Sequence, residues 1–236
     1  DTVAAAKNIA SHTEDDPCNG LVDAELSPKT LQDLDLFHLW DVQPQQAAEL
    51  AKECEAAGLA VDARLTNSDG AQVNTQQSLR LYGNSHGFIG AYAGTRHGLS
   101  CVVIGEDENG MQRDYWYTTA RKATDLDSAE QVGRLAGERT VARLSPQNAP
   151  TGSYPVMFAP NMASGLFGHL IGAISGGALY RRASFLLDSM GQQVLPEWLS
   201  LTERPHLPNS LGSANFDGDG VATRSKSFVA DGRVAS

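Results

Sequence analysis

Residues 60–119 alternate between strand-like runs and turn signals, and this pattern constrains the fold more than any other feature of the chain. A period of two residues is typical of a strand with one buried face. In the clearest runs, the residues that share one face are Val73, Thr75, Gln77, Leu79 and Leu81, and then Met111, Arg113, Tyr115 and Tyr117. The turn signals between runs are Asn67-Ser68-Asp69-Gly70, Asn84-Ser85-His86-Gly87 and Asn109-Gly110. We interpret these signals as hairpin ends, so the stretch predicts an antiparallel meander.

A helix is expected before the meander. Pro44 suits its first position, because proline has no amide hydrogen to leave unpaired there and its φ is already helical. Gly58 suits the left-handed residue that commonly ends a helix. Between them, one apolar face is made of Ala47, Leu50, Ala51 and Cys54. The spacing of these residues is that of one side of an α-helix.

A second helix is expected after the meander. Ser128 and Gln131 form a capping box, which is typical of a helix start. Residues 1–14 carry the pattern of a further amphipathic helix, whereas residues 15–40 are expected to be irregular. The breakers in that irregular segment are Pro17, Gly20 and Pro28.

Residues 145–155 have the Pro, Ser, Asn and Gly content of a linker, and we place a domain boundary there. The predicted domains are 1–36, the end of an amino-terminal domain and a linker; 37–146, a central α+β meander domain; and 147–236, the beginning of a carboxy-terminal β-rich domain. Beyond the boundary we expect a short strand at 156–158, a Gly-rich helix at about 161–176 and a strand near 194–202. The predicted fold class is α+β: an antiparallel β-meander sheet with flanking helices, followed by the start of a second β-rich domain with a Gly-rich buried helix.

The charge balance excludes two classes of partner. The chain has 28 acidic and 18 basic residues, for a formal net charge of −10. A nucleic-acid binder needs a basic surface that displaces counterions, and an anionic membrane surface also attracts basic segments. We therefore expect no nucleic acid and no membrane among the partners.

The cysteines indicate a reducing compartment. Cys18, Cys54 and Cys101 are odd in number, far apart and without a C-x-x-C pair. A disulfide framework is therefore not expected. We predict inert, partly buried thiols and a cytoplasmic protein.

The stretch from Val156 to Tyr180 contains no Lys, Arg, Asp or Glu. Its length would allow a membrane span, but proline, asparagine, serine and histidine interrupt it, and no aromatic belt flanks it. We therefore interpret it as a buried helix. Gly168, Gly172 and Gly176 recur every four residues, and the missing side chains would let another backbone come close.

Residues with recognisable chemistry are scattered. His169 lies on the Gly-rich helix with no second His and no Glu within a turn, so it lacks the companions of a zinc-protease helix. We expect it to be a core or interface residue. His86 and His97 could approach each other across a hairpin, but no third ligand accompanies them. The run Phe216–Gly220 suggests a calcium loop, but apolar residues occupy two positions that need oxygen ligands, so a surface turn is favoured.

Several blocks of the chain resemble the PmbA/TldD family, also called the modulator of DNA gyrase family. These blocks are Tyr82–Gly87, Arg113–Tyr115, Gly168–Gly177, Ser184–Ser189, Pro205-His206-Leu207, and Phe216-Asp217 with Gly220-Val221. The resemblance is colinear over the whole chain and is closest to the PmbA/TldE branch. It implies that the chain is an internal fragment covering roughly half of such a protein.

The resemblance implies a cytosolic, heterodimeric zinc metalloprotease in which a TldD subunit holds zinc with the helix motif H-E-x-x-x-H. Aligning that helix by its glycines places Phe167 and Gly168 at the His-Glu pair and Gly172 at the second His. None of these three residues has a side chain that binds a metal or moves a proton, and His169 falls out of register. The resemblance therefore implies no catalytic residue, metal site or cofactor in this chain, with zinc in a TldD-like catalytic subunit.

Different classes of function stay open. The first is a non-catalytic, TldE-like subunit of a peptide-degrading protease, which closes a chamber, holds an extended peptide against a sheet edge or stabilises its partner. The second is a stand-alone peptide- or protein-binding regulator, for instance a homodimer. A third, an independent zinc enzyme, predicts stoichiometric zinc. Candidates for structural or interface contacts are Arg113, Asp114, His169, Arg181 and Asp188; for the charged ones, ordinary surface salt bridges are the alternative.

Overall fold

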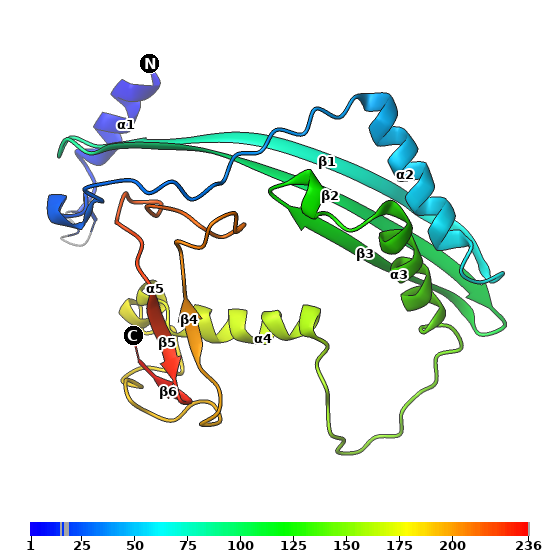
Figure 1. Cartoon of the computed structure of the whole chain (residues 1–236). Helices are drawn as coiled ribbons and strands as arrows, with labels where there is room; N and C mark the ends of the chain where they lie inside the picture. The colour runs from blue at the N-terminus through cyan, green and yellow to red at the C-terminus, as the bar shows by residue number, and fades with distance from the viewer. Residues whose placement is uncertain (15, 17–18, 236) are drawn as a thin grey trace.

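The structure is a computed structural model that describes residues 1–14, 16 and 19–235. Its α-helices are α1 (Thr2–Ala10), α2 (Pro44–Leu59), α3 (Ala129–Val141), α4 (Pro160–Ala173) and α5 (Gly176–Tyr180), with short 3-10 helices at Ala24–Leu26 (η1) and Ala123–Asp125 (η2). Its strands are β1 (Leu65–Gly83), β2 (Ile89–Asp107), β3 (Gly110–Ala120), β4 (Leu201–Glu203), β5 (Lys226–Ala230) and β6 (Arg233–Val234). The α+β class is confirmed (Figure 1). The predictions for Pro17 and Cys18 lie outside the described residues.

The central sheet is an antiparallel meander in the order β1-β2-β3. The predicted hairpin ends at Asn84–Gly87 and Asn109-Gly110 are confirmed, because Gly83 pairs with Ile89 and Asp107 pairs with Gly110. Strands β1 and β2 have 19 residues each and continue past the end of the 11-residue β3. The parts of these strands beyond β3, residues 76–83 and 89–96, project as a long two-stranded ribbon toward α1 (Figure 1). We call this ribbon the arm.

The third predicted hairpin end is wrong. Asn67–Gly70 lies inside β1, where the register against β2 shifts between Leu65 and Asn67 and again between Ser68 and Gly70. Gly70 has a φ of +96°. A bulge uses the same residue types as a turn, because it also needs a backbone with positive φ. The local sequence could not separate the two.

Helices α2 and α3 cover one face of the sheet. Their shared core contains Cys54, Cys101, Val103, Val132 and Ala136, all of them fully buried. Pro44 opens α2 and Ser128 caps α3 by accepting a hydrogen bond from the Gln131 amide at 3.1 Å, so both predicted helix starts are confirmed.

Gly58 is not the C-cap that the sequence suggested. It lies inside α2 and is buried against α3, whereas the helix ends at Leu59 with Ala60 in ordinary helical geometry. The two helices cross backbone to backbone at this point. A Cβ added to Gly133 would lie 1.9 Å from the Cys54 carbonyl oxygen, and one added to Gly137 would lie 2.5 Å from that of Gly58. Glycine is needed here because no side chain fits between the helices.

The carboxy-terminal part holds a small antiparallel sheet in the order β4-β5-β6. Its apolar cluster is centred on Ile174, Leu186 and Val234. The strand expected at 156–158 is absent. These residues belong to the irregular segment that leads into α4. The strand expected near 194–202 is reduced to Leu201–Glu203.

The prediction that the Gly-rich helix is buried is wrong. No residue of α4 is buried, and a Cβ added at Gly165, Gly168 or Gly172 would find no atom within 4 Å. Only its last turn packs, through Leu170 and Ile171, onto the carboxy-terminal cluster. The remainder extends away from that cluster, so the composition of the helix correctly indicated an apolar surface but not a neighbour inside this chain. The glycine-mediated close approach expected here occurs instead between α2 and α3.

The carboxy-terminal segment 205–222 joins the two parts of the molecule. Phe216 is fully buried in an aromatic cluster with Tyr82, Phe88 and Tyr92 of the arm, at ring-centroid distances of 5.3 to 6.3 Å. The predicted turn after Phe216 is present, since the Asp217 carboxylate accepts from the amides two and four residues on. The segment is therefore a surface turn with a deeply buried aromatic anchor.

Candidate functional site

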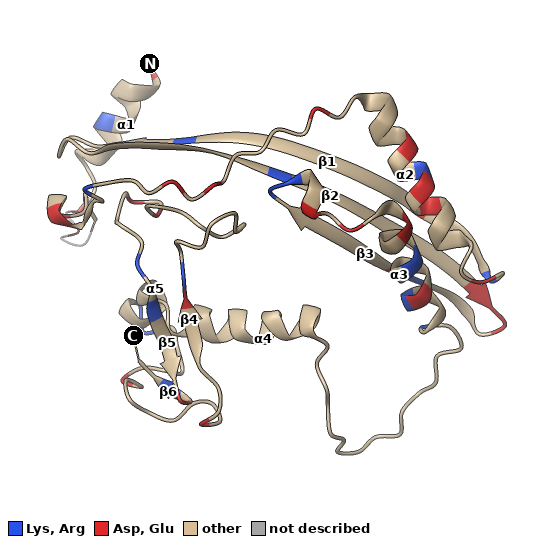
Figure 2. Ribbon diagram, in the orientation of Figure 1, with Lys and Arg blue, Asp and Glu red and all other residues tan. Residues whose placement is uncertain are grey.

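Helix α4 presents the positions at which the resemblance would place metal ligands. Phe167 is half-buried, whereas Gly168, His169 and Gly172 are exposed. In Figure 2 the ribbon of α4 is tan throughout, so it holds no Lys, Arg, Asp or Glu, in contrast to α2 and α3. With the linker before it, α4 exposes Val156, Met157, Phe158, Met162 and Leu166.

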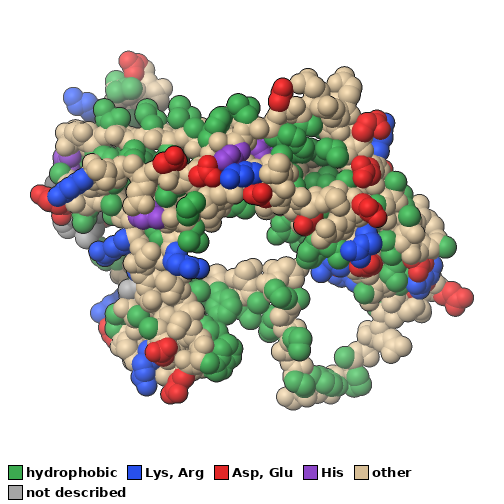
Figure 3. All heavy atoms as spheres, in the orientation of Figure 1, with side chains coloured by type: hydrophobic (Ala, Val, Ile, Leu, Met, Phe, Trp, Pro, Cys, Tyr) green, Lys and Arg blue, Asp and Glu red, His purple; other side chains and the backbone are tan. Residues whose placement is uncertain are grey.

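An opening separates α4 from the central sheet, and hydrophobic side chains gather on the helix and on the linker beside it (Figure 3). None of the helices in the described ranges combines the length and the apolar composition of a membrane span. The uncharged helix lies beside this opening (Figure 3).

The candidate contacts on β3 serve different neighbours. The guanidinium of Arg113 lies 2.6 Å from a carboxylate oxygen of Asp69 on β1, and both side chains are well exposed. Asp114 is buried on the opposite face. Its carboxylate oxygen Oδ2 lies 3.3 Å from the guanidinium of Arg139 in α3 and 3.5 Å from that of Arg143, just after α3. Asp114 therefore ties β3 to α3.

The remaining candidates lie in the carboxy-terminal part. Arg181 follows α5 and is exposed, as is Asp188. Asp188 has a φ of +58° and its carbonyl accepts from the Gln192 side-chain amide at 3.0 Å. The structure does not bring Arg181 or Asp188 together with Arg113 or Asp114.

The two histidines that might have met across a hairpin are apart. His86 lies in the turn at the tip of the arm, where Nδ1 is 3.0 Å from the Val22 carbonyl. His97 is buried mid-strand, with Nδ1 2.9 Å from the Thr75 hydroxyl and Nε2 2.8 Å from the His38 carbonyl. Both ring nitrogens of His97 are thus used within the fold. Among the described residues, no group of three His, Cys, Asp or Glu side chains is placed to hold a metal ion.

Cys54 and Cys101 are free, and they are fully buried in the central core rather than partly buried as predicted. The pKa of the Cys54 thiol is raised, because this thiol donates a hydrogen bond to Cys101 and because burial disfavours the thiolate. A thiolate nucleophile is therefore disfavoured at Cys54.

The open face of the central sheet, opposite α2 and α3, carries three glycines of β2 spaced four residues apart. Phe216 lies over Gly90, where an added Cβ would come within 2.8 Å of its ring. The Arg121 guanidinium lies over Gly94, 2.9 Å from such a Cβ. Two of the three gaps left by the glycines are thus filled by side chains from elsewhere in the chain.

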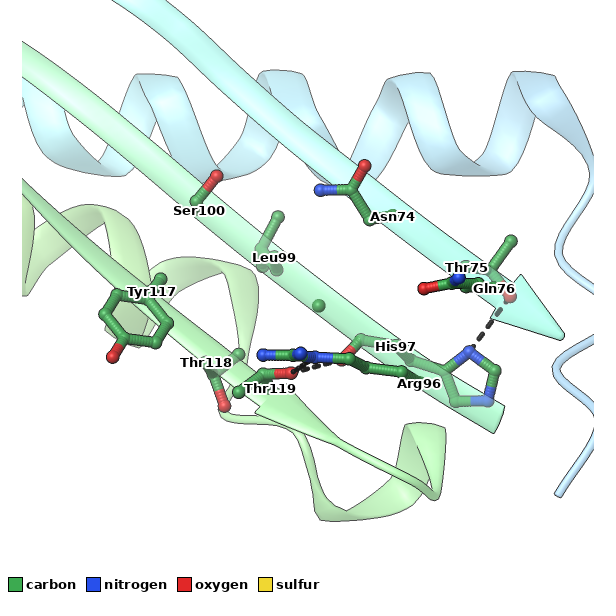
Figure 4. A pocket seen from close by; sticks show the side chains of 11 residues that line it. Asn74, Thr75, Gln76, Arg96, His97, Leu99, Ser100, Tyr117, Thr118 and Thr119 are labelled. Carbon is green, nitrogen blue, oxygen red and sulfur yellow. Dashed lines mark hydrogen bonds between the residues drawn. The ribbon is translucent and has the colours of Figure 1, made fainter. Parts of the chain in front are cut away.

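At the third glycine, Gly98, the sheet is hollowed. The hollow measures about 470 Å³ and its polar lining comes from all three strands (Figure 4). The lining side chains that carry polar groups on this face are Asn74, Gln76, Arg96, Ser100, Tyr117 and Thr119. Sequence reasoning missed this hollow. Its only sequence signal was the spacing of Gly90, Gly94 and Gly98 within one strand, since a glycine inside a strand often marks a close approach of another group.

Two family models match the chain. The PmbA/TldA metallopeptidase central domain matches residues 37–144, and the PmbA/TldA metallopeptidase C-terminal domain matches residues 151–236. The chain belongs to the PmbA/TldD family. The resemblance drawn from the sequence blocks is thereby confirmed.

Curated relatives agree with this membership. Metalloprotease PmbA of Escherichia coli O157:H7 is 48% identical over 231 residues, which are 98% of this chain and 51% of that protein. A PmbA homologue of Haemophilus influenzae is 44% identical over 230 residues, again 98% of this chain and 51% of the relative. The chain therefore spans about half the length of these relatives.

Solved structures share the fold. A protein from Bacteroides thetaiotaomicron, described as a modulator of DNA gyrase, superposes with a TM-score of 0.92 at 26% identity over 100% of this chain and 54% of its own. TldE from Thermococcus kodakarensis superposes with a TM-score of 0.74 at 19% identity, over 98% of this chain and 52% of its own. At that identity, the likeness to TldE concerns the fold alone.

Proposed function

We propose that this chain is the non-catalytic, TldE-like subunit of a cytosolic TldD/TldE-type zinc metalloprotease that degrades or trims peptides. One observation carries the proposal. On the exposed helix α4, the positions that align with the H-E-x-x-x-H motif are Phe167, Gly168 and Gly172. These residues offer neither an imidazole to hold zinc nor a carboxylate to take a proton from a bound water.

Zinc does not fit the donor set of this helix. A catalytic zinc takes three protein ligands and keeps one position for water. Helix α4 contains one imidazole, that of His169, and has no Asp, Glu or Cys. We therefore route no chemical step through this helix and assign zinc to a TldD-like catalytic subunit.

The geometry supports a role in shaping a shared chamber. Helix α4 is uncharged and exposed at the opening below the central sheet, so it can form a wall against an extended peptide or a partner surface (Figure 3). Strand β1 lies at the edge of the sheet, and in the described part of the chain no strand pairs with its outer side. A free strand edge can hold an extended peptide through main-chain hydrogen bonds.

The test is association and metal content. The full-length protein is co-expressed with a homologous subunit that carries H-E-x-x-x-H, and each is also purified alone. We expect a stable heterodimer with about one zinc per complex and no stoichiometric zinc in the separate TldE-like subunit. Stable homodimers with no affinity for the partner would instead support a stand-alone regulator, and stoichiometric zinc in the isolated protein would make it an independent enzyme.

A further inference from the structure

We propose that the hollow over Gly98 binds a carboxylate group of a peptide, with Arg96 as its anchor. This inference rests on the proposed function, because it names the part of a peptide substrate that the subunit would hold. It follows from three features of the open sheet face. Two of the three glycine gaps are filled and one is not, the Arg96 guanidinium has no ion pair among the described residues, and the other polar side chains that line the hollow are neutral.

The glycine series shows what such a gap accepts. The Gly90 gap takes an aromatic ring and the Gly94 gap takes a guanidinium, both supplied by the chain itself. Each of the three nitrogens of Arg121, over Gly94, already donates to a carbonyl; the acceptors are Thr95, Ser210 and Leu211, at 2.9 to 3.1 Å. At Gly98 the chain supplies no such cover, and the hollow stays accessible.

Arg96 is the one charged side chain that lines the hollow. Its Nε donates to the Thr119 hydroxyl at 3.3 Å, which holds the side chain across the sheet (Figure 4). In the described parts of the chain no ion pair includes Arg96, although acidic residues outnumber basic ones by 28 to 18. Its two terminal nitrogens therefore remain for a ligand, and a guanidinium matches a carboxylate with two parallel hydrogen bonds.

The rest of the lining selects a small anion. Asn74, Gln76 and Ser100 are neutral side chains that can donate hydrogen bonds to oxygen, whereas the Thr119 hydroxyl already donates to the His97 carbonyl at 3.1 Å. With no carboxylate in the lining to repel it, a single negative charge meets one cation and several neutral donors. A free peptide carboxylate supplies such a charge on a small planar group.

The hollow also lies within reach of a peptide on the free sheet edge. Gln76 of the edge strand β1 is directly opposite Arg96 in the register. Side chains opposite each other on one face are neighbours, with Cβ atoms about 5 Å apart. A peptide that runs along β1 can thus place its terminal carboxylate or an acidic side chain over Arg96.

The experiment measures equilibrium binding to the full-length protein alone, by fluorescence anisotropy at low salt. The probe is an octapeptide of Ala, Gly and Thr that carries an uncharged BODIPY dye on its amino end. It is made with a free carboxylate end, with an amidated end, or with an amidated end and one internal Asp. We expect the free acid to bind about tenfold more tightly than the neutral amide, as is typical when a hydrogen-bonded charge is removed. Tight binding of the Asp peptide would identify a side-chain carboxylate as the ligand.

Variants assign the effect to this hollow. Arg96→Gln should lower the affinity for the free acid to that of the amide, and Arg96→Lys should retain part of it. Arg134→Gln is the matched control with the same charge change, because Arg134 pairs with Glu138 on α3, on the other side of the sheet. Equal binding of acid and amide, no binding of either, or an unchanged affinity in Arg96→Gln would each overturn the proposal. Because no partner subunit is present, these outcomes are independent of whether a zinc protease forms.

Discussion

Replacing Gly133 with valine is expected to destabilise the central domain by about 3 kcal/mol or more, at the upper end of the usual cost of overpacking. Even the first carbon of the new side chain would lie 1.9 Å from the Cys54 carbonyl oxygen, which belongs to the backbone of α2 and cannot rotate away. The helices would have to separate, and this would open the core that contains Cys101, Val103 and Val132. Urea unfolding monitored by circular dichroism measures the change in the free energy of unfolding.

Gly172→Ala is the control for an unpacked helix glycine. Gly172 is also inside a helix, but no atom lies within 4 Å of an added Cβ. Alanine is a better helix former than glycine by about 1 kcal/mol, so this variant should be neutral or slightly stabilising. A mild effect of Gly133→Val, or a strong destabilisation by Gly172→Ala, would contradict the account of which helix glycines are packed.

Phe216→Ala is expected to release the carboxy-terminal segment from the arm. Phe216 is fully buried and contacts three aromatic rings, so its loss should cost about 3–5 kcal/mol, as for other buried aromatic residues. The Arg80 guanidinium, which lies 5.6 Å from the centroid of the Phe216 ring, would lose that contact as well. The segment 205–222 and the tip of the arm should then open together.

Amide hydrogen exchange measures this opening directly. We expect exchange in residues 82–92 and 205–222 to accelerate by at least about a hundredfold, since local opening free energies set protection. Phe185→Ala is the control, because Phe185 lies in the same part of the chain but is 84% exposed. Unchanged protection in both segments would mean that the anchor does not hold the two parts together.

Features fixed by neighbouring residues could be predicted from the sequence. The turn at Asn84–Gly87 and the cap at Ser128 depend on the preferences of a few adjacent residues, and the structure has both. Asn67–Gly70 was misassigned because a bulge with positive φ at Gly70 has the same local chemistry as a turn. The difference is decided by the pairing of β1 with a distant part of β2.

Features that depend on long-range neighbours could not be predicted. The burial of Gly133 requires α2 and α3 to cross at one point, and the exposure of α4 reflects the absence of any covering element among the described residues. The hollow at Gly98 requires the register of three strands together with the positions of Phe216 and Arg121. None of these follows from spacing within a single element.

Peptide cleavage by the reconstituted complex tests the central claim most directly. The proposed complex is prepared with the H-E-x-x-x-H glutamate of the TldD-like protein intact or changed to glutamine, and the present protein is left unaltered. Because a general base contributes roughly a factor of 10² to 10⁴, the account predicts at least a hundredfold loss of cleavage while the heterodimer still forms. Cleavage that persists in the substituted complex, or that this subunit performs without a partner, would contradict the claim that α4 carries no catalytic chemistry.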